Sequence, residues 1–202
     1  EAGWLAREHA KGNSFIEREA ATVSYLKSIN SDHMKIIFLD IDGVLNNSID
    51  TERHEFADAN HRKDSLPYSK RCVDNLNELT DKSGAKIVVS STWRMGETDE
   101  SMESVLKGMG ITGEYLGMTG RESHKDDCIF RGNEILSWIR RNVHHCGYHS
   151  NFRSYVILDD DSDMLLWQKH NYVNCDPEVG MTQRTVFKAL SILNNAPCLD
   201  TG

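Results

Sequence analysis

A short apolar run that ends in two closely spaced carboxylates constrains this chain more than any other stretch. Residues 36–39 are continuously apolar, which is typical of a strand buried on both faces. Asp40 and Asp42 follow, and side chains two residues apart in an extended chain share a face, so Ile41 should turn into the core. Gly43 permits a sharp turn. Two acids at the end of a buried strand need a partner, and Mg²⁺ prefers carboxylate oxygens.

The composition bounds the class of protein. A chain of 202 residues with 39% hydrophobic residues can build one domain, or one domain with an appendage. The net charge of −8 argues against a broad electrostatic surface for nucleic acid. Five scattered cysteines without a C-x-x-C pair favour free thiols in a reducing compartment, so we expect a cytoplasmic protein. No apolar run approaches the ~20 residues of a membrane span.

The first 33 residues stand apart from the rest of the sequence. We expect residues 1–33 to form an N-terminal extension, helical or linker, and residues 34–202 to form the domain. An amphipathic helix is predicted at residues 17–27. The extension has three open explanations: a vector-derived leader, a fused segment, or a native element that docks on a protein partner or self-associates.

Apolar runs and helical periodicity alternate through residues 34–202. Further strands are predicted at residues 86–89, 155–158 and 172–174, with a short one near Tyr115. Helices are predicted at residues 68–82, 100–107, 131–143, 164–169 and 182–193. This alternation predicts an α/β fold with a central parallel sheet and helices on both faces. Ligands of such sheets bind at the carboxyl ends of the strands.

Polar residues follow two of these other strands. Ser90 and Ser91 offer hydroxyl and backbone N–H donors for a phosphate oxygen, although a serine there can also cap a helix. Residues 159–163 carry four aspartates that can bind a metal ion. A calcium loop is excluded, because its sixth and twelfth positions hold Met164 and His170 instead of Gly and Glu.

Taken in order, these segments resemble the haloacid dehalogenase (HAD) superfamily of phosphohydrolases. More specifically, the chain looks like the small HAD domains of "Swiss army knife" RNA repair proteins. The segments that carry this resemblance are residues 40–46, 90–94, 131–135, 158–161 and 176–182. The resemblance implies a Rossmann-like HAD fold. The segments between the motifs are too short for a large cap domain.

The resemblance assigns roles to the first two motifs. It implies that Asp40 is the nucleophile that forms an aspartyl-phosphate, and that Asp42 is the general acid and base. It also implies that a serine of the second motif binds the phosphate. Ser90 is the first choice and Ser91 the alternative.

The third motif of the HAD superfamily is a Lys or Arg that neutralises the nucleophile and the phosphate, and the resemblance places it in this chain near residues 125–131. Arg131 is the best placed residue, since a helix N-terminus beside it would also favour an anion. Lys125 is the alternative. An arginine before a helix can also be a solvated surface residue.

The fourth motif supplies metal ligands. The resemblance implies Asp160 as the principal Mg²⁺ ligand and Asp159 as a supporting one. They would act together with Asp40 and the backbone carbonyl of Asp42.

These observations predict a Mg²⁺-dependent phosphomonoester hydrolase. A site without a large cap is open, which suits a macromolecular phosphate such as an RNA or DNA end. A long polar loop at residues 47–67 could instead close the site over a small molecule or a nucleotide. The alternative of another class is a catalytically silent HAD-like binding module that uses residues 1–33 as its interaction element.

Overall fold

The computed structural model describes residues 34–50, 68–120, 130–144 and 152–195. The predictions for residues 1–33, for Lys125 and for most of the 47–67 loop lie outside these ranges. No helix in the described ranges is long and apolar enough to cross a membrane.

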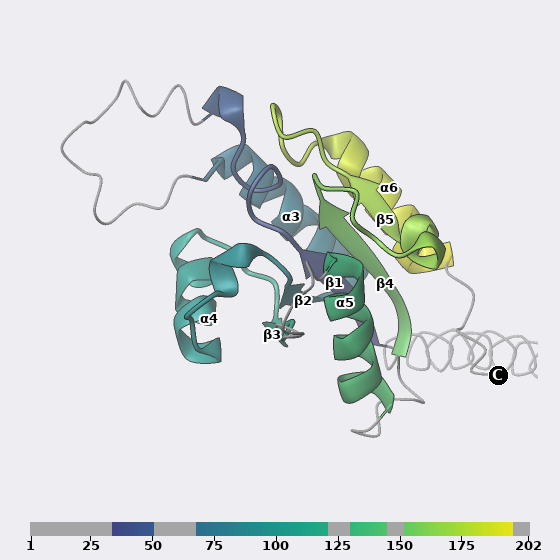
Figure 1. The fold of residues 1–202 in the computed structure, drawn as a ribbon. Helices are drawn as coiled ribbons and strands as arrows, with labels where there is room; N and C mark the ends of the chain where they lie inside the picture. Colours follow the sequence, from purple (N-terminus) through teal and green to yellow (C-terminus); the bar gives the residue numbers. More distant parts are fainter. Residues whose placement is uncertain (1–33, 51–67, 121–129, 145–151, 196–202) are drawn as a thin grey trace, which may run out of the picture. The chain divides into compact units, whose positions relative to one another are not determined.

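One five-stranded parallel sheet forms the centre of the fold, in the order β3-β2-β1-β4-β5 (Figure 1). The strands are β1 Met34–Leu39, β2 Lys86–Val89, β3 Tyr115–Met118, β4 Phe152–Asp159 and β5 Tyr172–Asn174. Every strand in the described ranges belongs to this sheet. The predicted Rossmann-like α/β fold is therefore confirmed.

Helices connect the strands. The α-helices are α3 Lys70–Ser83, α4 Asp99–Gly108, α5 Arg131–Ile139 and α6 Gln183–Asn195, and the shorter elements are η1 Thr92–Arg94, η2 Arg140–His144 and η4 Leu166–His170. Two predictions were inaccurate. The helix predicted over residues 131–143 changes to π-helical geometry after Ile139, and the segment 164–169 forms only a short 3-10 helix from Leu166.

Helices cover both faces of the sheet, and the side chains along the apolar run of β1 are therefore all buried. Ile37 and Leu39 belong to a core cluster with residues of α3, α4 and α6. Ile36 and Phe38 belong to a second cluster with residues of α5, and Phe38 packs edge-on against Trp138. The continuous apolar run thus has the two-sided burial that the sequence predicts.

Helix α3 has a clear beginning and end. Ser69 caps its first turn, where its hydroxyl accepts a hydrogen bond from the Cys72 N–H. Gly84 ends the helix in the left-handed conformation, with φ of 66°. Gly84 follows the predicted helix as a typical stop signal, whereas the cap by Ser69 was not predicted.

Candidate active site

The register of the sheet brings three strand ends together. Leu39, the last residue of the central strand β1, pairs with Val89 of β2 and with Leu158 of β4. The residue after each of these therefore lies at the same edge of the sheet. These three residues are Asp40, Ser90 and Asp159, and all are buried.

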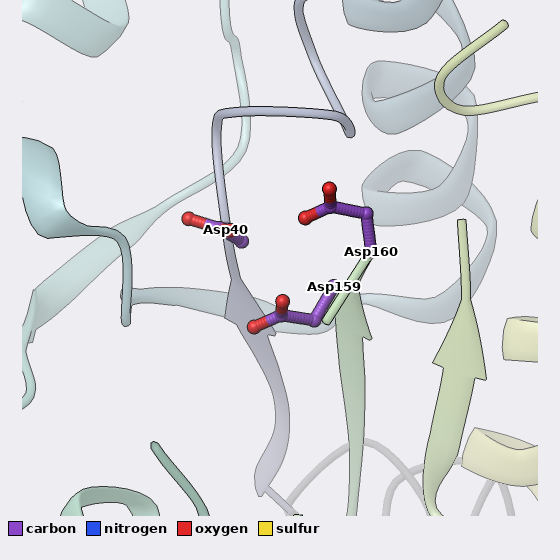
Figure 2. A group of neighbouring side chains, drawn as sticks. All are labelled: Asp40, Asp159 and Asp160. Carbon is purple, nitrogen blue, oxygen red and sulfur yellow. The ribbon is translucent and has the colours of Figure 1, made fainter. Parts of the chain in front are cut away.

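Three carboxylates form a cluster at this edge. One oxygen each of Asp40, Asp159 and Asp160 lies within 4.8 Å of the others. Figure 2 shows the two acids at the end of β4 beside the turn that carries Asp40. It is the only group of three or more potential metal-ligating side chains in the described ranges.

The cluster carries more negative charge than its surroundings compensate. Burial, and then the charge of Asp40, raise the pKa of Asp159 to about 8, although Arg131 opposes this rise. Burial likewise raises the pKa of Asp160. Asp40 Oδ1 and Asp159 Oδ2 are buried, and both oxygens pair with the same guanidinium, that of Arg131. A hard divalent cation fits this donor set.

Arg131 lies between the two buried acids. Its Nη1 is 3.0 Å from Asp40 Oδ1, and its Nε is 3.2 Å from Asp159 Oδ2. Nη1 also donates a hydrogen bond of 2.9 Å to the Ser90 carbonyl. Burial disfavours its charge, but Asp40 and Asp159 together raise the pKa of Arg131. Arg131, the first choice for the cation of the third motif, therefore lies against Asp40, whereas Lys125 is outside the described residues.

The N-terminus of α5 is not open to an external anion. The Arg131 N–H donates to Asp163 Oδ2 at 2.9 Å, and the Gly132 N–H donates to the Asp163 carbonyl. The expectation that this helix end would help to bind phosphate is therefore wrong. Nothing in the sequence separated Asp163 from the neighbouring acids.

The two serines after β2 have different surroundings. The Ser91 hydroxyl accepts from the Trp93 N–H at 3.4 Å and caps η1. The Ser90 hydroxyl is buried and has no hydrogen-bond partner within the described ranges. The helix-cap interpretation thus applies to Ser91, and Ser90 is left as the hydroxyl available to a ligand. The Thr119 hydroxyl, which sequence reasoning missed, is also buried without such a partner.

Asp42 lies outside the metal-ligating cluster. It is exposed, whereas Ile41 is fully buried, as expected. Its carboxylate accepts one hydrogen bond from Asn46 Nδ2 at 2.7 Å and another from Trp93 Nε1 at 2.9 Å. The contact with Trp93 was not predicted, because the two residues come from different strand ends. Any metal role of Asp42 falls to its backbone carbonyl.

Comparison with known families agrees with this arrangement. A family model described as "HAD domain in Swiss Army Knife RNA repair proteins" matches residues 36–186, which is more than half of the chain. The chain belongs to this family of HAD domains. Neither the curated proteins nor the solved structures gave a match. HAD membership implies phosphatase-type hydrolase chemistry, for which HAD domains generally use a divalent metal.

Gly43 allows the acid cluster of this HAD domain to assemble. The residue has φ of 67°, and a Cβ atom there would lie 2.4 Å from Asp160 Cγ and 2.8 Å from Asp160 Cβ. The sequence predicted the turn, but not this close approach of Asp160. Any larger residue at position 43 must turn the Asp160 carboxylate away.

A divalent metal held by the acid cluster would stabilise this HAD domain, and we expect Gly43→Ala to remove most of that stabilisation, with Mg²⁺ as the test ion. Mg²⁺ at 100 times its Kd adds about 2.7 kcal/mol to the free energy of unfolding. For a chain of this size that corresponds to a rise in Tm of roughly 5–10 °C. The rise should be largely lost in the variant, because Asp160 is displaced. Thermal unfolding with and without Mg²⁺ measures it.

Gly84→Ala is the matched control for this experiment. Gly84 has nearly the same φ, but a Cβ atom there meets nothing within 4 Å. Both variants should lose about 1–2 kcal/mol of stability through backbone strain. Only Gly84→Ala should keep the Mg²⁺ response. An equal response in both variants would contradict the role of Gly43.

Proposed function

We propose that this HAD domain hydrolyses phosphate monoesters in a Mg²⁺-dependent reaction through an aspartyl-phosphate. One observation carries the proposal: Asp40 is buried at the end of the central strand and paired with Arg131, and it lies beside Ser90, whose hydroxyl has no hydrogen-bond partner among the described residues. A nucleophile, a cation for the phosphate and a hydroxyl donor are the groups that phosphoryl transfer requires.

In the first half of the reaction, Asp40 attacks the phosphorus atom. The bond from phosphorus to the leaving oxygen breaks, and Asp42 donates its proton to that oxygen. In the second half, Asp42 takes a proton from a water molecule, which attacks the phosphorus atom and releases Asp40 and inorganic phosphate. The hydrogen bonds from Asn46 and Trp93 support this role, because they fix the Asp42 carboxylate at the rim of the site.

The remaining residues bind and neutralise the transferred group. Arg131 would bind a phosphate oxygen while it compensates Asp40, and the Ser90 hydroxyl would donate to another oxygen. Asp40, Asp159, Asp160 and the Asp42 carbonyl would hold Mg²⁺, which would supply further positive charge to the phosphate. Arg131 and Mg²⁺ therefore share the task of offsetting negative charge in the cluster.

We further propose a phosphorylated RNA or DNA end as the substrate. The family is described by its occurrence in RNA repair proteins, which points to a substrate related to nucleic acid. The segments between the motifs are too short for a large cap domain, which favours an open site that admits the end of a polymer.

Phosphate release from a panel of substrates tests both levels of the proposal. The panel contains 3′-phosphorylated and 5′-phosphorylated oligonucleotides, mononucleotides, p-nitrophenyl phosphate and phosphopeptides, each with Mg²⁺ and with EDTA. We expect Mg²⁺-dependent release, with the highest kcat/KM for an oligonucleotide end. Preference for mononucleotides would indicate a small-molecule phosphatase. No turnover of any member would indicate a catalytically silent binding module and would contradict the proposal.

A further inference from the structure

Arg94 and Glu134 form a buried ion pair beside the candidate active site. Arg94 ends the short helix η1 after β2, and Glu134 lies in the first turn of α5. Their side chains are only 7% and 9% exposed, and Arg94 Nη2 donates to Glu134 Oε2. The pair therefore joins the segment that carries Ser90 to the helix that carries Arg131.

The Arg94 guanidinium also holds three backbone carbonyls. Nη1 donates to the carbonyls of Ser90 and Ser91, both at 2.6 Å, and Nε donates to the carbonyl of Thr119 at 3.0 Å. Together with the contact to Glu134, these contacts use four of the five N–H groups of the guanidinium. Arg94 is thus committed to the protein, and it is not a second cation for the phosphate.

Two of the residues held in this way have hydroxyls without a hydrogen-bond partner in the described part of the chain. Ser90 and Thr119 follow the adjacent strands β2 and β3, and Arg94 fixes the backbone carbonyl of each. Their buried hydroxyls neither accept nor donate a hydrogen bond within the described ranges. Buried hydroxyls are normally hydrogen-bonded, so an unsatisfied pair at a strand edge indicates a ligand.

Arg131 is tied to the same assembly by two contacts. Its Nη1 donates to the Ser90 carbonyl at 2.9 Å, so this one oxygen accepts from both arginines. Glu134 lies three residues after Arg131 on α5, and Arg94 holds it. A shift of Arg94 would therefore move both the Ser90 hydroxyl and the Arg131 guanidinium.

Stability alone does not account for a buried pair of this kind. Burial lowers the pKa of Arg94 and raises the pKa of Glu134, and each partner opposes the shift in the other. Apolar residues of similar volume often stabilise a core as well as a buried ion pair does. The fork of a guanidinium, in contrast, can hold several carbonyls in a fixed arrangement.

We infer that Arg94 and Glu134 are positioning residues that fix the Ser90 hydroxyl and the Arg131 guanidinium relative to each other for binding of the phosphate. The inference rests on the proposed function. Neither residue touches the substrate. They act through the backbone of the segment after β2 and through the first turn of α5.

Arg94→Met tests this inference by its effect on phosphate binding. We expect KM for p-nitrophenyl phosphate and the Kd of inorganic phosphate to rise at least about tenfold. We also expect kcat to fall about 10²-fold, as a displacement on the order of 1 Å can cause. Phosphate binding is measured by calorimetry on the Mg²⁺-loaded protein. It needs no turnover, so it remains informative if the protein proves inactive.

Ser154→Ala is the control for a structural effect alone. Ser154 is buried near the start of β4, away from the carboxyl edge, and its hydroxyl donates to the Leu193 carbonyl at 2.8 Å. Its loss should lower stability and leave KM and the phosphate Kd unchanged. Activities are compared at equal folded fraction, determined by urea unfolding.

The outcomes separate this inference from the proposed function. If the wild type is active and Arg94→Met has the same KM and the same phosphate Kd, the positioning role alone is overturned. A wild type that neither binds phosphate nor hydrolyses any ester overturns both. If Arg94→Met does not fold, Glu134→Gln decides by the same two constants, because it removes the charge of the pair and keeps the volume. Unchanged constants in Glu134→Gln would then overturn the inference.

Discussion

Asp40→Asn is expected to abolish hydrolysis of p-nitrophenyl phosphate, with kcat reduced by at least about 10³-fold, or roughly 4 kcal/mol of activation free energy. An amide oxygen does not form the phosphorylated intermediate that we propose for the carboxylate. The fold should persist, because Asn has nearly the same volume and because Arg131 keeps its contact with Asp159. Steady-state kinetics at saturating Mg²⁺ measure the loss.

Asp161→Asn is the matched control for Asp40→Asn. Asp161 belongs to the same acidic segment as Asp159 and Asp160, but it is exposed and lies outside their cluster. The kcat of Asp161→Asn should stay within about threefold of the wild-type value, since surface substitutions usually have small effects. Full activity of Asp40→Asn would eliminate Asp40 as the nucleophile.

Arg131→Met should produce the second large effect, on both stability and catalysis. Without the guanidinium, Asp40 and Asp159 lose the cation that lies within 3.2 Å of both carboxylates in the described part of the chain. Removal of one partner from a buried ion pair lowers the free energy of unfolding by about 3–5 kcal/mol. Urea unfolding in EDTA measures this loss, and saturating Mg²⁺ should restore part of it. We expect kcat to fall by about 10²–10³-fold, which is typical for the loss of a transition-state donor.

Two further variants make this prediction specific. Arg131→Lys should recover part of the stability, but a single ammonium group cannot contact Asp40, Asp159 and the Ser90 carbonyl together. Lys125→Met should keep the activity of the wild type, because Arg131 already lies against Asp40. A loss of activity confined to Lys125→Met would assign the cation of the third motif to Lys125 instead.

The sequence determined the fold and the list of candidate site residues. Continuous apolar runs between polar segments predicted the strands, and the runs at residues 86–89 and 172–174 are strands with these bounds. Burial is recorded locally in such runs, so their interpretation needs no tertiary information. The ends of helices were less accurate. The change after Ile139 and the late start at Leu166 depend on packing, which periodicity does not record.

Only the tertiary structure decided which of these candidates meet. The register of β1 with β2 and β4 brings Ser90 and Asp159 to Asp40, and the Ser90 hydroxyl there has no hydrogen-bond partner among the described residues. The tertiary structure also revealed the close approach of Gly43 to Asp160 and the hydrogen bonds from Arg94 to backbone carbonyls. These contacts join residues far apart in the chain, so no local pattern encodes them. The sequence therefore predicted the acids at the end of the first strand, and the sheet register supplied their partners.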